Sequence, residues 1–114
     1  MAAVALNTFK TIRHELTTST VGIYTAPIGV ASIVVSAQIA NVSTGTTTCM
    51  TTFSHYRADG GELDLVKNAG IPLRDALSPI TDRLVLETDD EIRVSGNENG
   101  VLQLTMSVLE TAKG

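Results

Sequence analysis

The sequence has 114 residues, of which 43% are hydrophobic and 4% aromatic, and its formal net charge is −4. This length fits one domain, because two half-length domains would each bury too little apolar surface. The acidic balance has the wrong sign for binding nucleic-acid phosphates. The single cysteine excludes an internal disulfide, and no Cys/His pairing has metal-ligand spacing, so the sequence predicts no cofactor and no metal.

A long uncharged stretch is the most unusual compositional feature. No Asp, Glu, Lys or Arg occurs from Leu16 to Tyr56. A membrane span would need about 20 mainly apolar residues, whereas polar residues, Pro27 and several glycines interrupt this stretch, so we predict no membrane partner. Charged residues are also depleted in the cores of protein interfaces. Two interpretations follow: a surface that contacts another protein, or a Thr/Ser-rich strand face in water.

The chain begins with small, weakly patterned residues. Residues 1–10 lack a basic region followed by a long apolar run, so we expect no secretory signal. We expect residues 1–10 to form an N-terminal arm that becomes ordered against a neighbour, and residues 11–114 to form a single domain.

Alternation of apolar and polar residues predicts short strands in the first half of the chain. The expected strands are Thr11–Leu16, Val21–Tyr24, Ser32–Ala40 and Thr46–Arg57. The apolar residues of the third strand are expected to share one face: Ile33, Val35, Ala37 and Ile39.

Turn signals divide the second half. Asp59–Gly61 predicts a hairpin, followed by a strand at Glu62–Lys67. The segment Asn68–Ile80 contains two prolines and is expected to hold a short strand or one helical turn. Three strands then follow, separated by turns at Thr88–Asp90 and Gly96–Gly100, and we expect them to form an antiparallel meander. Their apolar faces are Leu84 and Leu86, Ile92 and Val94, and Leu102, Leu104, Met106 and Val108.

About seven to eight short strands with turn signals every ~8–12 residues are typical of a sandwich or small barrel. We therefore predict an all-β fold, an antiparallel, jelly-roll-like β-sandwich.

Several residues suggest chemistry, but each has a simpler explanation. An acidic cluster could bind Ca²⁺ through its oxygen atoms: Asp82, Glu87, Asp89, Asp90 and Glu91. No glycine has calcium-loop spacing, and Asp is a typical turn residue, so we favour a turn.

The remaining candidates are isolated. His14 and His55 have no positioned nucleophile nearby, so no enzyme is predicted. Cys49 lies among threonines and is expected to fill the core rather than react. Asn41-Val42-Ser43 matches the glycan acceptor triplet, but without a secretory signal we interpret it as a turn.

Two stretches resemble small β-sandwich virion proteins of tailed bacteriophages. Val21–Val42 resembles their opening, in which a Tyr-Thr-Ala-Pro-small-Gly turn, here Tyr24–Gly29, leads into a long strand ending in Asn. Leu84–Ser95 and Val101–Glu110 are similar to the group's Leu-x-x-Gly-Asp-x-Ile-x-Val hairpin and last strand, with Thr88-Asp89-Asp90 in place of Gly-Asp. The resemblance covers about residues 20 to 110.

The resemblance implies a structural protein of the virion, assembled in the bacterial host cytoplasm. We expect a capsid decoration or cement protein that stabilises the head shell through protein–protein contacts. The alternative is a neck, tail, baseplate or fibre component. A glycan-binding module is less favoured, because the chain has no Trp and two Tyr. The expected partners are the major capsid protein or other virion proteins, and further copies in a small homo-oligomer such as a trimer.

The contact surfaces are expected on the arm, which is able to add a strand to a neighbour's sheet edge, and on the uncharged strand. The predicted interface residues are Ala2, Val4, Leu6, Phe9, Thr46, Thr48, Met50 and Thr52.

Overall fold

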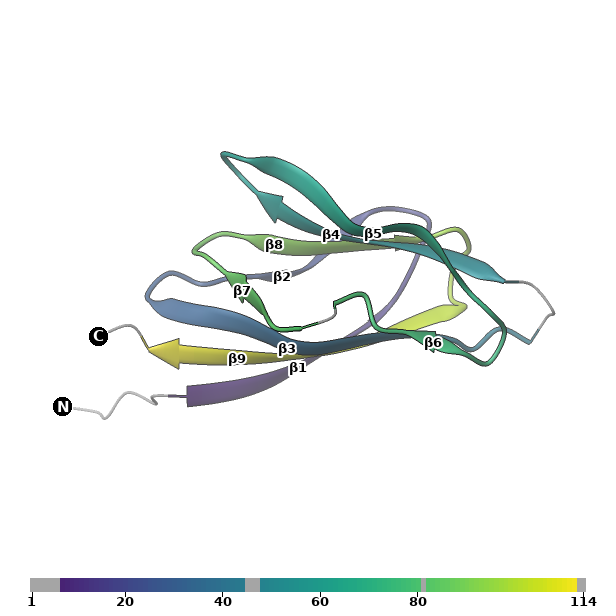
Figure 1. The fold of residues 1–114 in the computed structure, drawn as a ribbon, viewed down its shortest axis with the longest axis horizontal. Coiled ribbons are helices and arrows are strands. Elements are labelled where there is room, and N and C mark those ends of the chain that lie inside the picture. The colour runs from purple at the N-terminus through teal and green to yellow at the C-terminus, as the bar shows by residue number, and fades with distance from the viewer. Residues whose placement is uncertain (1–6, 45–47, 81, 113–114) are drawn as a thin grey trace.

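The computed structural model describes residues 7–44, 48–80 and 82–112, and in these ranges the chain is all-β. The strands are β1 (Asn7–Glu15), β2 (Val21–Thr25), β3 (Val30–Asn41), β4 (Cys49–Arg57), β5 (Gly61–Ile71), β6 (Ala76–Leu77), β7 (Leu84–Leu86), β8 (Glu91–Gly96) and β9 (Leu102–Ala112). Two antiparallel sheets pack against each other (Figure 1), which confirms the predicted sandwich. No helix in the described ranges could span a membrane.

The two sheets differ in the number and order of their strands. The first sheet has the order β1-β9-β3, with the short strands β6 and β7 both paired to the far edge of β3. The second sheet has the order β2-β8-β4-β5. The core between the sheets consists mainly of aliphatic side chains, and its largest fully buried members include Phe53, Leu16, Ile39, Ile71, Leu86, Ile92, Leu102, Leu104 and Met106. Each such side chain contributes roughly 1.5–3 kcal/mol by leaving water.

Strand boundaries differ from the sequence predictions at several points. β1 already begins at Asn7, whereas residues 1–6 of the expected arm lie outside the described ranges. β5 continues through the expected break as far as Ile71, because Asn68 adopts a φ of 48° inside an irregular pairing with β4. The predicted hairpin at Asp59–Gly61 is confirmed, and Gly61 supplies its positive φ of 78°.

The predicted face of β3 is wrong in its first half. Val34 of β3 pairs with Val108, but the next pair is Ser36 with Ser107, so Val35 is an extra residue. Such a bulge reverses the alternation of side chains beyond it. Ala37 and Ile39 point into the core as expected, whereas Ile33 lies on the opposite face from the buried Val34.

The predicted meander is also wrong, because β7, β8 and β9 do not pair with one another. β7 pairs with β3, β8 pairs with β2 and β4, and β9 pairs with β1 and β3. The turns Thr88–Asp90 and Gly96–Gly100 therefore connect opposite sheets. The apolar faces of successive strands therefore meet across the core. Turn residues alone do not distinguish a connection between two sheets from a hairpin within one sheet.

Candidate interaction surface

At one end of the first sheet, polar residues point into the sandwich. Ser32 of β3 and Glu110 of β9 lie opposite each other and are buried. The hydroxyl of Tyr24, from β2 in the second sheet, lies 3.0 Å from the Ser32 hydroxyl and donates a hydrogen bond to Glu110. The Lys10 ammonium lies 3.2 Å from the other carboxylate oxygen. These four residues, which we call the buried polar row, form a satisfied network that links the two sheets.

The buried polar row has a fixed protonation state at neutral pH. The hydrogen bond from Tyr24 and the interaction with Lys10 lower the pKa of Glu110 against the opposing effect of burial. Burial, together with the hydrogen bond to Glu110, raises the pKa of Tyr24 to about 12. Glu110 is therefore ionised and Tyr24 protonated, so neither group is placed to exchange protons near pH 7.

One residue further along each strand, apolar side chains point outward. Phe9 of β1 lies opposite Leu109 of β9, and Leu109 in turn lies opposite Ile33 of β3. Ile33 also lies opposite Val85 of β7. Residues opposite each other share a face, and their strand neighbours Ser32 and Glu110 point inward. Phe9, Leu109, Ile33 and Val85 thus form an apolar row across four strands on the outer face, and Phe9 and Val85 are 73% and 60% exposed.

The strands of the rest of this outer face carry little charge, although Arg74, Asp75, Asp82 and Arg83 lie beside β3 in the adjoining loops. The strands place mainly short polar or small side chains there, namely Thr11, Ser36, Gln38, Ala40, Gln103, Thr105 and Ser107. The only charged side chains that the strands add are Arg13 and Glu15, in the part of β1 away from Phe9. An exposed apolar row beside a polar surface that carries little charge is typical of a protein-contact site.

The outer face of the second sheet is of the ordinary, solvated kind. Arg93 of β8 stacks 3.6 Å above the centre of the Tyr56 ring, and its Nε lies 3.1 Å from Glu91. Its NH1 lies 3.5 Å from Glu62 of β5. Gly22 of β2 leaves room for this cluster, because a Cβ there would lie 2.6 Å from Glu91 Oε1. The charges of Arg93, Glu91 and Glu62 are therefore satisfied within the chain.

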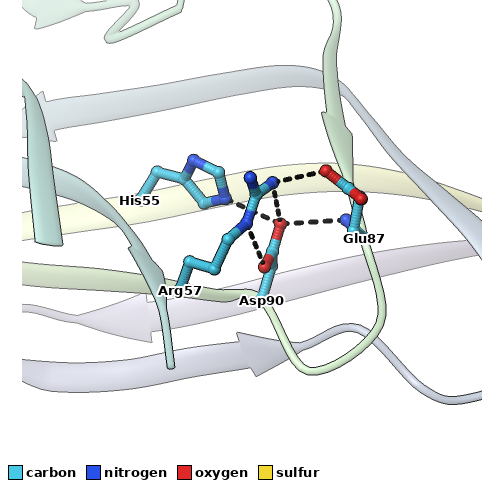
Figure 2. A network of polar contacts seen from close by, with 4 residues as sticks. All are labelled: His55, Arg57, Glu87 and Asp90. Carbon is cyan, nitrogen blue, oxygen red and sulfur yellow. Dashed lines mark hydrogen bonds and ion pairs between the residues drawn. The ribbon is translucent and has the colours of Figure 1, made fainter. Parts of the chain in front are cut away.

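A second polar network, formed by His55, Arg57, Glu87 and Asp90, fixes the turn that precedes β8 (Figure 2). Arg57 of β4 donates to both carboxylate oxygens of the buried Asp90, at 3.0 and 2.9 Å, and also contacts Glu87 at 2.8 Å. Asp90 Oδ2 also lies 2.9 Å from His55 Nε2 and accepts the Glu87 N–H at 2.9 Å. Asp89 completes the turn with a φ of 69°. The sequence-based interpretation of Thr88–Asp90 as a turn is therefore confirmed.

The electrostatics of this network also indicate a structural role. The hydrogen bonds from Arg57 hold the pKa of Asp90 well below its usual range, although burial acts in the opposite direction. The same bonds raise the pKa of Arg57. Asp90 accepts four hydrogen bonds, so its oxygens are already occupied by the chain. Within the described ranges, no three His, Cys, Asp or Glu side chains gather as a ligand set.

The predicted interface residues are dispersed. Ala2, Val4, Leu6 and Thr46 lie outside the described residues. Phe9 belongs to the apolar row of the first sheet. Met50 and Thr52 belong to the outer face of the second sheet, where Met50 is 45% exposed and the Thr52 hydroxyl accepts the Asn68 N–H at 3.1 Å. Thr48 precedes β4 and is exposed.

The other candidate residues from the sequence are Cys49, His14 and His55, and they do not lie together. Cys49 is fully buried, as predicted, and burial raises the pKa of its thiol. His14 lies in β1 of the first sheet and His55 in β4 of the second, so they belong to separate sheets. The Nε2 atom of His14 is buried without a hydrogen-bond partner among the described residues.

Sequence reasoning missed three members of the apolar row. Leu109 follows Val108, and Val85 lies between Leu84 and Leu86, all of which were expected to face the core. The alternation of side chains therefore already placed Leu109 and Val85 on the outer face. Ile33 carried no such signal, because the run Ile33-Val34-Val35 is apolar in both registers.

Comparisons with known proteins indicate a shared architecture. No protein-family model matches the sequence, and no curated protein matches it either. Among solved structures, a protein of Bacillus endospore appendages, described as disulfide-linked pili, has a TM-score of 0.55 and 12% identity, covering 100% of this chain and 98% of that one.

A second similar structure is a phage protein. A chain of the acid-stable capsid of Helicobacter pylori bacteriophage KHP30 has a TM-score of 0.58 and 11% identity, covering 96% of this chain and 90% of that one. At these identities the likeness establishes the fold alone. The neighbours are proteins of a pilus and of a capsid, and this sandwich is therefore one that occurs in assembled structures.

Proposed function

We propose that this protein is a structural component of a tailed-phage virion, and that it decorates or cements the head shell through protein–protein contacts. The observation that carries the proposal is the inverted end of the first sheet. There, Ser32 and Glu110 occupy the core while Ile33 and Leu109 face outward. Exposing apolar side chains costs free energy in an isolated domain, so the arrangement favours a covered outer face.

The size of the face suits such a role. The strands β1, β3 and β9 have 9, 12 and 11 residues, and with the short β6 and β7 they cover roughly 600 Å², from ~4.8 Å between strands and ~3.4 Å per residue. A standard stable interface buries about 800 Å² per partner, so this face would supply most of one. The chemistry is burial alone: many copies that each bridge neighbouring shell subunits would hold the shell together by area and multivalency.

The sequence-predicted contacts form a second part of the proposal. The arm residues Ala2, Val4 and Leu6 precede Phe9 in the sequence, and we include them among the proposed contacts. The segment Thr46–Thr52 would place Thr48, Met50 and Thr52 against a different neighbour, because β4 belongs to the other sheet. The major capsid protein is the proposed partner of the first sheet, and the protein acts as a small homo-oligomer.

Two alternatives remain distinguishable. A neck, tail, baseplate or fibre component would use the same surface at a different location. A disulfide-linked filament is disfavoured, because Cys49 is the single cysteine and is 0% exposed.

The test is rebinding to phage shells stripped of accessory proteins, with the bound mass measured by light scattering and the positions by electron microscopy. Binding in stoichiometry with the local symmetry axes of the shell supports the cement role. Binding at a single vertex or to tails replaces it with the neck or tail role. No binding to any particle overturns the virion proposal.

A further inference from the structure

The edge of the first sheet formed by β1 is unusually open. β1 pairs with β9 in an unbroken register from Asn7 to Glu15, and the described residues place no strand on its other side. It contains no proline and no bulge. Natural proteins usually protect such an edge, because its free N–H and C=O groups bind another strand.

The other sheet edges are protected. β2 has five residues and a bulge between Gly22 and Tyr24. β5 is long, but its register shifts twice and Asn68 has a positive φ. β6 and β7 have two and three residues. Among the described strands, β1 alone offers a long, regular ladder.

The free hydrogen-bonding groups of β1 belong to its odd-numbered residues. Leu16, which directly follows β1, donates its N–H to the carbonyl of Leu102 in β9 at 2.9 Å. In an antiparallel pair, alternate residues direct both backbone groups toward the partner. The even-numbered residues of β1 therefore bond to β9, while Phe9, Thr11 and Arg13 direct their N–H and C=O groups outward.

We propose that β1 pairs with β1 of a second copy of this chain, antiparallel about a two-fold axis at Thr11. Two-fold interfaces use the same patch on both copies. In this register Thr11 faces the second copy's Thr11, and Phe9 faces the second copy's Arg13, a favourable cation–π pair. All the bonded pairs involve odd-numbered residues, so every ladder bond uses a group left free by β9.

Charge selects this register over its neighbours. An axis at Lys10 would place two lysines opposite each other, and an axis at Arg13 would do the same with two arginines. Like charges directly opposite each other destabilise a strand pair. An axis at Ile12 would place Phe9 opposite Glu15 and so lose the pairing of Phe9 with Arg13. The axis at Thr11 places Lys10 opposite Ile12 and Glu15 opposite Asn7.

This inference is independent of the proposed function, because it uses the edge of the first sheet rather than its outer face. The dimer would join two first sheets into one continuous sheet. The two apolar rows would then lie on the same side, and a dimer could contact a partner twice.

The first test uses two proline variants. Thr11→Pro removes an outward N–H, which an edge strand tolerates, whereas Ile12→Pro removes an N–H that bonds to β9. The wild type is expected to be a dimer by sedimentation at about 50 µM, within the usual range of specific association. Thr11→Pro should bind its copy roughly 10- to 100-fold more weakly, because both ladder bonds at the axis are lost, and its melting temperature should equal that of the wild type at concentrations where both are monomers. Ile12→Pro should lower the melting temperature.

The second test does not depend on proline tolerance. Residues facing each other in a bonded pair have Cα atoms about 5.5 Å apart, within the range of about 4.4–6.8 Å that a disulfide spans. Thr11→Cys should therefore form a covalent dimer on mild oxidation, and Cys49 is too buried to compete. Ser107→Cys, in the middle of the outer face, should not. A monomeric wild type, or a dimer that Ser107→Cys cross-links and Thr11→Cys does not, overturns the proposal.

Discussion

The two outer faces of the sandwich handle polarity in opposite ways. On the second sheet, Arg93 is satisfied by Glu91, Glu62 and the Tyr56 ring, so the face is complete in water. On the first sheet, the charged Glu110 lies inside and Ile33 lies outside. The first sheet therefore exposes an apolar row that a partner would cover, whereas the Arg93 cluster of the second sheet is satisfied within the chain.

The largest expected effect is on shell binding. Ile33→Lys places a charge in the centre of the apolar row and should abolish detectable rebinding to stripped shells, because an unpaired charge would be buried at the contact. The melting temperature should change little, since Ile33 points away from the core. Rebinding is measured by co-sedimentation with shells.

Met50→Lys is the matched comparison, because it adds the same charge to an outward position of β4, within the interface segment predicted from the sequence. If the first sheet contacts the shell and Thr46–Thr52 contacts a neighbour other than the shell, Met50→Lys keeps full occupancy. Loss of binding in Met50→Lys with normal binding in Ile33→Lys would exchange the roles of the two faces and favour the surface expected from the sequence. Thr51 is unsuitable for this test, because it is buried and its hydroxyl donates to the Ser95 carbonyl at 3.0 Å.

The largest expected effect on stability lies in the Asp90 network of the second sheet. Asp90→Ala should lower the free energy of unfolding by about 3 kcal/mol, because Arg57, the N–H of Glu87 and the imidazole all lose their acceptor. The pKa of Asp90 is lowered in the fold, so its contribution is present above its unfolded pKa of about 4 and is lost as the pH falls below it. Urea unfolding at pH 7 and pH 3 measures both effects. An equal loss between these pH values in wild type and Asp90→Asn would contradict this account.

The buried polar row of the first sheet should respond at the alkaline end. The pKa of Tyr24 is raised to about 12 from an ordinary value of 10.0, so the fold favours its protonated form. This contribution is complete below pH 10 and is lost as the pH rises toward 12, with a total of about 2–3 kcal/mol. Tyr24→Phe should flatten the decline between pH 10 and 12 in chemical unfolding experiments. A decline of unchanged size in Tyr24→Phe would assign it to another group.

The sequence predicts the fold class because alternation and turn residues are local properties. The strand from Leu102 to Val108 faces the core as predicted, since it has a strict period of two and no bulge. The connections were not predictable in this way. The turn at Thr88–Asp90 has the residues of a hairpin, yet it crosses between sheets, because Asp90 is bonded to Arg57 of β4, far away in sequence.

The apolar row as a whole could not be predicted from the sequence because of one bulge in β3. The extra residue Val35 reverses the face of Ile33, and a run of three β-branched residues contains no pattern from which the reversal follows. Glu110 at the end of an apolar strand was the clearest available sign that this end of the sheet differs, because a carboxylate at an inward position needs partners. Those partners, Tyr24 and Lys10, come from strands that only the fold brings together.

The smallest expected effect concerns the charges on the second sheet. Arg93→Ala removes the stack on Tyr56 and both ion pairs, but exposed ion pairs contribute little because water and salt screen them. The unfolding midpoint should therefore remain within experimental error, and shell binding should be unchanged. A clear loss of binding in Arg93→Ala with a normal midpoint would mean that the paired charges themselves recognise a partner. The contrast between a solvated and a covered face would then fail, because both faces would be contact surfaces.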